Sequence, residues 1–243
     1  MNTKVKQGII ERAIANPQQE ICGFIVYGEG FVKDIPCNNT VQQNSAHAFQ
    51  IDPQDYIRAS RIGRVCGVYH SHPTGPAAFS ERDIEAALAL ALPSFVVALS
   101  PDKDPQWLSY VPPNYFVPSL GRPWAWGEAD CLEAVRVYYR QEKGIYLTDY
   151  DRDESFRETQ SDAILQHIEA EGFTCVGTDV SSAAIGDVFL FNTDGRKFPH
   201  HLGVCVEKSR IYHHPFGRLS CVDDINHHWL RYLKGIYRYS KTA

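Results

Sequence analysis

A proline-rich segment over residues 101–123 constrains the fold of this chain more than any other feature. Proline fixes φ and has no backbone N–H to donate, so a regular helix or a central strand is not expected there. The chain has 243 residues, enough for two domains of about 100–130 residues flanking such a segment. We therefore predict a first domain over residues 1–105, a proline-rich linker over 106–122 and a second domain over 123–243.

The composition supports packed domains and argues against several classes of protein. Hydrophobic residues make up 44% of the chain and aromatic residues 12%, enough to form a core. The net charge is −5 and neither half is basic, which argues against nucleic-acid binding. No apolar run reaches the roughly 18 residues of a membrane span, and charges interrupt the N-terminal apolar positions, so no signal peptide is expected. Seven scattered cysteines without a CxxC pair suit a reducing cytosol.

The first half alternates helical and strand patterns. Apolar residues recur at helical spacing between Val5 and Ile14, and residues 21–32 have the pattern of a hairpin. A short apolar strand over 64–69 runs directly into the sequence His70-Ser71-His72-Pro73, and a helix is expected to follow from Ser80. This order places polar side chains at the end of one strand.

The two histidines at this strand end are candidate metal ligands. Residues two apart on a strand point to the same face, so His70 and His72 can reach one ion. Asp83, in the first turn of the next helix, could supply a third ligand and leave a fourth position for water, which is the arrangement of catalytic zinc. A carboxylate is still needed to take the proton of that water, and Glu20 at the head of the first strand is the candidate.

Ser80 and Asp83 also have a purely structural interpretation. Ser at the N-cap with an acid three residues later forms a capping box, and the HSHP sequence could be an ordinary polar loop. The complete pattern of Glu20, His70, His72, Ser80 and Asp83 nevertheless resembles the JAMM/MPN metalloprotease motif over residues 1–100. The resemblance implies a Zn²⁺ ion held by His70, His72 and Asp83, Glu20 as general base, Ser80 stabilising the tetrahedral intermediate, and cleavage of peptide or isopeptide bonds.

A thiol and two histidines form the second candidate site. Asp130 is a plausible N-cap, which places Cys131 in the first turn of a helix, where amide donors favour a thiolate. His201 and His213 flank a predicted hairpin twelve residues apart, so they should lie close together on adjacent strands. Strand alternation places His201 on one face, displayed outward from a packed sheet.

Two alternatives remain open for this second site. Cys131 could be a buried core residue without a function, and His200 or His214 could replace His201 or His213, because the strand pattern is approximate. The pattern of Cys131, His201 and His213 resembles the NlpC-like family of papain-fold cell-wall peptidases, which implies these three as catalytic residues. Trp124 stands where that family often has a tyrosine, so a contribution from the tyrosine hydroxyl is not expected.

The tandem of the two domains resembles tail tip assembly proteins of lambda-like phages over essentially the whole chain. It implies an α+β protein with an MPN-like α/β metalloprotease domain and a papain-like α+β cysteine peptidase domain. It also implies phage tail tip proteins and peptidoglycan stem peptides as partners, and a location in the host cytoplasm during tail assembly or in the virion tail tip. The alternatives are a non-catalytic factor that binds tail tip proteins and a host-type cytosolic peptidase or isopeptidase.

Overall fold

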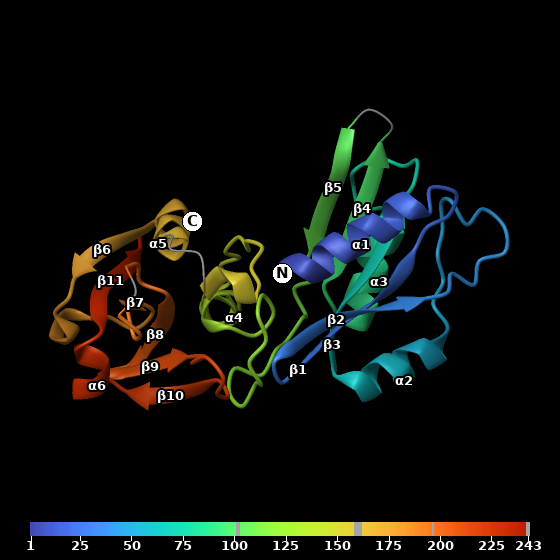
Figure 1. Ribbon diagram of the computed structural model, residues 1–243. Helices are drawn as coiled ribbons and strands as arrows, with labels where there is room; N and C mark the ends of the chain where they lie inside the picture. Colours follow the sequence, from blue (N-terminus) through green and yellow to red (C-terminus); the bar gives the residue numbers. More distant parts are fainter. Residues whose placement is uncertain (101–102, 158–161, 196, 242–243) are drawn as a thin grey trace. The chain divides into compact units, whose positions relative to one another are not determined.

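The computed structural model describes residues 1–100, 103–157, 162–195 and 197–241. The chain divides into two compact units, Met1–Phe116 and Val117–Ala243, each built as a mixed α and β structure (Figure 1). Among the helices of the described residues, none combines the length and apolar character needed to cross a membrane.

The first unit is a five-stranded sheet in the order β2-β1-β3-β4-β5. β3 and β4 are parallel and the other pairs are antiparallel. Its elements are α1 (Thr3–Ala15), β1 (Cys22–Gly28), β2 (Phe31–Cys37), α2 (Pro53–Ile62), β3 (Arg64–His72), α3 (Glu81–Leu90), β4 (Ser94–Ser100) and β5 (Lys103–Tyr110). The expected helix, hairpin and strands of this half are confirmed, whereas α2 was not foreseen.

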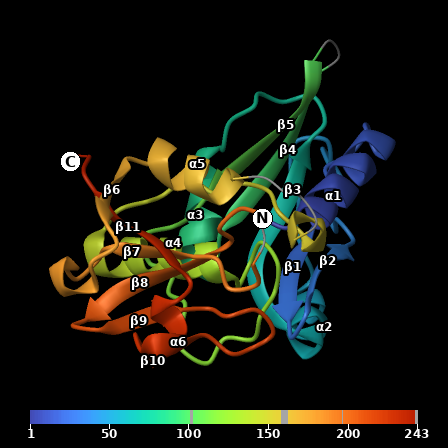
Figure 2. The ribbon, with the colours of Figure 1, turned by 60° about the vertical axis from the view of Figure 1, so that its left-hand side comes forward.

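Helices cover both faces of this sheet, as Figure 2 shows. α2 packs with β1 and β3 through a core that includes Phe24, Val68 and Ala59. On the opposite face lies α1, where Arg12 Nη1 donates to Tyr69 Oη at 2.9 Å. Because parallel strands need a crossover connection, α3 leaves the end of β3 and returns to β4, which brings its first turn close to the end of β3.

The predicted linker over 106–122 begins too early. β5 extends to Tyr110 and includes Pro105, and the division between the units falls after Phe116. Among the described residues, β5 lies at the edge of the sheet and pairs with β4, and an edge strand tolerates a residue that cannot donate a hydrogen bond. The prolines therefore exclude a central strand but are compatible with the edge strand β5.

The second unit is a six-stranded antiparallel sheet in the order β10-β9-β8-β7-β11-β6. Its elements are α4 (Cys131–Lys143), the 3₁₀ turn η1 (Glu154–Arg157), α5 (Ala163–Ala170), β6 (Phe173–Gly177), the 3₁₀ turn η2 (Val180–Ser182), β7 (Val188–Phe191), β8 (His201–Glu207), β9 (Arg210–His213), β10 (Cys221–Asp224), α6 (His227–Leu230) and β11 (Leu233–Tyr239). α4 packs against one face in a core with Leu202 and Val204. The other face is also buried, by a cluster that includes Phe191 and Trp229.

Candidate active sites

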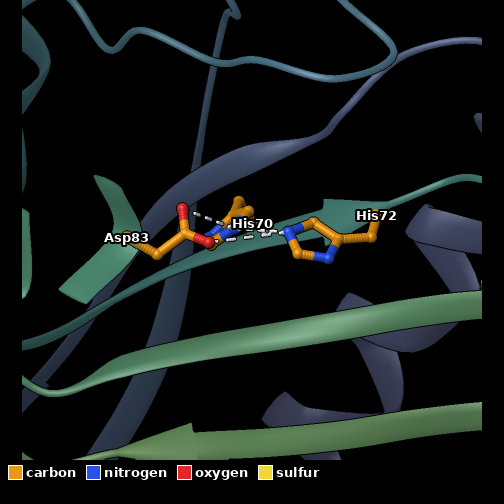
Figure 3. Close-up of side chains that lie close together, drawn as sticks. All are labelled: His70, His72 and Asp83. Atoms are coloured by element: carbon orange, nitrogen blue, oxygen red, sulfur yellow. Dashed lines mark hydrogen bonds and ion pairs between the residues drawn. The ribbon is translucent and has the colours of Figure 1, made fainter. Parts of the chain in front are cut away.

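His70 and His72 lie at the end of β3 and face Asp83 from the first turn of α3 (Figure 3). Nε2 of His70 is 3.1 Å from Nε2 of His72 and 3.3 Å from Oδ1 of Asp83, and Nε2 of His72 is 3.8 Å from Oδ2 of Asp83. His70 is only 1% exposed. The structure thus brings together the three residues that the sequence predicts as metal ligands.

The spacing of these atoms fits a tetrahedral zinc ion. Ligands about 2.0–2.1 Å from tetrahedral zinc lie about 3.3 Å from one another, close to the distances observed here. Nδ1 of His72 is 3.1 Å from the carbonyl oxygen of Pro76, so a proton on Nδ1 satisfies that carbonyl and leaves the Nε2 lone pair for a metal. Burial is the first influence on His70 and lowers its pKa, which favours the neutral form that a metal requires.

Ser80 and Asp83 form the capping box that was the structural alternative. The amide of Ser80 donates to Asp83 Oδ2 at 2.8 Å, and the amide of Asp83 donates to Ser80 Oγ at 3.2 Å. The hydroxyl of Ser80 donates to the same Oδ2 at 2.7 Å. Burial alone would raise the pKa of Asp83, but the hydrogen bonds from His70 and Ser80 hold it well below its usual range. The capping and ligand roles of Asp83 are therefore compatible.

Glu20 lies just before β1 and shares a cavity with the histidines, Ser80 and Asp83. The cavity has a volume of about 780 Å³, and its walls are largely apolar. Glu20 is 5% exposed, and its burial, followed by the negative charge of Asp83, raises its pKa to about 8. A carboxylate held this way is a stronger base than one in water.

One wall of this cavity was not foreseen from the sequence. Phe49 stacks on His70 with ring centroids 4.5 Å apart. Phe49 belongs to the segment between β2 and α2, which carries no motif. The stacking restricts the orientation of the His70 ring and keeps water from its face.

In the second unit, Asp130 anchors the N-terminus of α4 and so positions Cys131. Its carboxylate accepts the amides of Gly127 and Glu133 at 2.9 and 3.0 Å. Arg152 donates to both carboxylate oxygens, at 2.7 and 2.8 Å, and the two side chains are only 1% and 2% exposed. The cap was predicted, but Arg152 was missed, because nothing in the acidic run that surrounds it indicates a partner 22 residues away.

His201 and His213 meet across the hairpin of β8 and β9, as predicted. Nε2 of His201 is 2.9 Å from Nδ1 of His213, and Nε2 of His213 is 3.3 Å from Oδ2 of Asp223. These three residues form a chain of side chains that leads from β8 to β10. Asp223 was missed, because its pairing with His213 depends on how β10 joins the sheet.

The expectation that His201 is displayed outward from the sheet is wrong. Trp229 stacks on His201 with ring centroids 5.6 Å apart, and both side chains are buried. The face expected to be open is covered by α6, which the sequence did not predict. Burial, followed by the electrostatic effect of His213, holds the pKa of His201 well below its usual range.

Cys131 and His201 line one cavity of about 230 Å³. Sγ of Cys131 lies 3.9 Å from the carbonyl oxygen of His200. Burial, followed by the charge of Asp130, raises the pKa of Cys131 to about 12, although nearby backbone amides lower it. The expected preference for a thiolate is therefore wrong for the resting site: both pKa shifts favour a neutral thiol beside a neutral imidazole.

The alternative histidines have other partners. His200 lines the same cavity, but its Nε2 lies 3.0 Å from Thr193 Oγ1 and 3.4 Å from Asp194 Oδ1. His214 is buried, with Nε2 3.1 Å from the carbonyl oxygen of Arg218 and its ring against Trp124. The structure pairs His201 with His213, and Trp124 lines the cavity with its indole.

Comparison with known proteins gives the family. Residues 2–110 match the model of prokaryotic homologs of the JAB domain, the MPN-like type expected of the first unit. Tail tip assembly protein K of Escherichia phage N15 is 30% identical over 241 residues, which cover 98% of this chain and 96% of that protein. The chain belongs to the tail tip assembly protein K family. Protein K of Escherichia phage lambda is 26% identical over 190 residues, 78% of this chain and 89% of that protein.

Some solved structures are also similar. A solution structure from Desulfitobacterium hafniense is 28% identical, with a TM-score of 0.37, over 44% of this chain and 80% of that one. A crystal structure described as similar to a lipoprotein of the NLP/P60 family, from Staphylococcus aureus, is 14% identical, with a TM-score of 0.33, over 98% of this chain and 61% of that one.

Proposed function

We propose that this member of the protein K family is a tail tip assembly protein with two peptidase sites, a zinc site in the first unit and a thiol site in the second. The observation that carries the proposal is the convergence of His70, His72 and Asp83 with Glu20 in one cavity. The family relatives are named for tail tip assembly, which supports work in the host cytoplasm during assembly and at the tail tip.

In the first unit, His70, His72 and Asp83 would hold the zinc ion. When bound there, zinc polarises a carbonyl and lowers the pKa of a water molecule. Glu20 accepts the proton of the attacking water and passes it to the leaving amine, a transfer suited to a carboxyl group whose pKa lies near neutrality. The Ser80 hydroxyl donates a hydrogen bond to Asp83 in this structure. By rotating about its side-chain bond it could instead donate to the oxyanion of the tetrahedral intermediate. The substrate is a peptide or isopeptide bond.

In the second unit, Sγ of Cys131 attacks the carbonyl carbon of a peptide bond and passes its proton to His201. His201 then donates this proton to the departing amine, and a water molecule releases the acyl group from the thiol. His213 accepts a hydrogen bond from Nε2–H of His201 and donates from its own Nε2–H to Asp223, which fixes the tautomer that leaves Nδ1 of His201 free to act as a base. Since the Cys131 motif resembles that of NlpC-like enzymes, the proposed substrate is the peptidoglycan stem peptide.

A cleavage assay tests both assignments. The full chain is incubated with purified peptidoglycan fragments or with tail tip proteins, and the products are identified by mass spectrometry. Glu20→Gln should abolish cleavage by the first site and Cys131→Ala cleavage by the second, each by about 100-fold or more. Cys175→Ala is the matched control, because Cys175 is an exposed free cysteine that should not matter. Equal cleavage by wild type and Cys131→Ala would contradict the thiol assignment, and no cleavage of either substrate by wild type would contradict both.

One observation favours a second candidate, a non-catalytic factor that binds tail tip proteins. Cys131 is 6% exposed and its pKa is raised to about 12, as in an inert thiol. Complementation of tail assembly separates the two candidates. A Glu20→Gln/Cys131→Ala double variant should fail to support infectious tails if the sites are enzymes and should support them if the chain only binds.

A further inference from the structure

Three side chains of metal-ligating types meet on β9 and β10 in the second unit. His213 and Cys221 are directly opposite each other in the register of the two strands. Asp223 lies two residues after Cys221 and therefore points to the same face of β10. His213 is fully buried, while Cys221 and Asp223 are partly exposed, so an ion could reach the cluster from solvent.

The distances within this cluster match those around one tetrahedral ion. Sγ of Cys221 is 3.7 Å from Nε2 of His213 and 3.7 Å from Oδ1 of Asp223, and His213 Nε2 is 3.3 Å from Oδ2 of Asp223. With zinc–sulfur bonds of about 2.3 Å and zinc–nitrogen bonds of about 2.0–2.1 Å, a nitrogen and a sulfur ligand lie about 3.6 Å apart. A thiolate, an imidazole and a carboxylate together suit zinc or a similar transition metal better than calcium or magnesium.

Arg218 is a cation that could compete with a metal for this cluster. Its Nη1 is 3.7 Å from Oδ2 of Asp223, but its side chain is 58% exposed. An exposed ion pair contributes little and can open at small cost. Arg218 therefore does not close the site to an ion.

We propose that His213, Cys221 and Asp223 form a binding site for a zinc-like transition metal, and that a metal there switches off the thiol peptidase site. The regulatory half rests on the function proposed above, whereas metal binding itself does not. The connection is His213, which faces the cluster with Nε2 and His201 with Nδ1.

The switch follows from the tautomer of His213. A metal takes the lone pair of Nε2, so the ring proton of neutral His213 must sit on Nδ1 and point at Nε2 of His201, 2.9 Å away. Nε2 of His201 then has to be an acceptor, and a neutral His201 carries its proton on Nδ1. In that form Nδ1 of His201 already carries a proton and cannot accept one from Cys131. A doubly protonated His201 is also disfavoured, because its Nε2–H would point at the Nδ1–H of His213. Metal binding thus removes the base.

Cobalt(II) titration of the full chain tests the metal site without measuring activity. Cobalt bound to a thiolate gives a near-ultraviolet charge-transfer band, and the first-unit ligands include no sulfur, so the band reports only a cysteine site. We expect the band in wild type, in Cys131→Ala and in the exposed-cysteine control Cys175→Ala, and its loss in Cys221→Ala. The unfolding midpoint of Cys221→Ser is compared with that of wild type. Equal midpoints show that loss of the thiol does not itself cause a folding defect. A missing band in wild type, or a band that disappears with Cys131 instead, would overturn the site.

Zinc inhibition of stem-peptide cleavage tests the switch. Cys221→Ala should cleave like wild type without added metal but need roughly ten-fold or more zinc for half inhibition, because it lacks one ligand. Equal zinc sensitivity of the two proteins would overturn the regulatory role. If metal-free wild type cleaves nothing, the proposed peptidase function fails, and the cobalt band still decides whether the metal site exists.

Discussion

Oδ2 of Asp83 accepts hydrogen bonds from both the amide and the hydroxyl of Ser80, at 2.8 and 2.7 Å. This arrangement secures the first turn of α3 and directs the other carboxylate oxygen, Oδ1, toward His70. A residue pair that the sequence explains as a helix cap thereby also presents a carboxylate oxygen to the histidine pair.

Replacing Ser80 by alanine should destabilise the first unit by about 1 kcal/mol, because the amide of Asp83 loses its capping acceptor. Ser80→Thr, which keeps a hydroxyl, should recover most of the loss. Urea unfolding monitored by Trp107, which lies in the first unit, provides the measurement. A Ser80→Ala protein as stable as wild type would show that the cap contributes nothing.

Arg152→Met should destabilise the second unit by about 3–5 kcal/mol, because the buried Asp130 carboxylate loses the guanidinium that neutralises it. Arg210→Met is the matched control: Arg210 is partly exposed and pairs with Glu207 and Asp224 at the surface, so its loss should cost less than about 1 kcal/mol. Thermal unfolding of both variants decides. Equal effects would mean that the buried pair does not position α4.

The same pair predicts how stability depends on pH. Burial alone would raise the pKa of Asp130, but Arg152 and the amides of Gly127 and Glu133 hold it below its ordinary value. A carboxyl with a depressed folded-state pKa contributes stability above its unfolded pKa of about 3.9 and loses it as the pH falls through the lower folded value. Asp130→Asn keeps a capping side chain, so its deficit relative to wild type should be largest near pH 7 and shrink below about pH 4. A deficit that is constant from pH 7 to pH 3 would contradict this.

The thiol of Cys131 should react slowly with iodoacetamide at pH 7. Its pKa is raised to about 12 by burial and by Asp130, and only the thiolate is nucleophilic. Cys175 is exposed and should be alkylated first, by a factor of roughly ten or more. Peptide mapping over time measures both rates in one sample. Faster alkylation of Cys131 than of Cys175 would contradict this and would indicate an ion pair between Cys131 and His201 in the resting protein.

The sequence predicts features that depend on neighbouring residues and misses those set by distant ones. His70, His72 and Asp83 could be assigned because they lie within fourteen positions on consecutive elements, and strand and helix periodicity fixes where they point. The hairpin that joins His201 and His213 is local in the same way.

Arg152, Asp223 and Phe49 could not be found, because each reaches its partner only through the packing of whole elements. The pKa of Cys131 was misjudged for a related reason. The position at a helix N-terminus is readable from the sequence, but the burial that outweighs it comes from tertiary structure.

The zinc content of the chain tests the assignment of the first-unit metal site. Cys221→Ala removes the second proposed site, so metal bound to this variant after equilibration with zinc and extensive dialysis belongs to the first unit. We predict one zinc ion per chain in Cys221→Ala and none when His70→Ala and His72→Ala are added to it. The control is the double variant Cys221→Ala/His47→Ala, which should also bind one zinc ion, because His47 lines the cavity without being a proposed ligand. Equal zinc in all three proteins, or none in any, would contradict the assignment of His70, His72 and Asp83 as a zinc site.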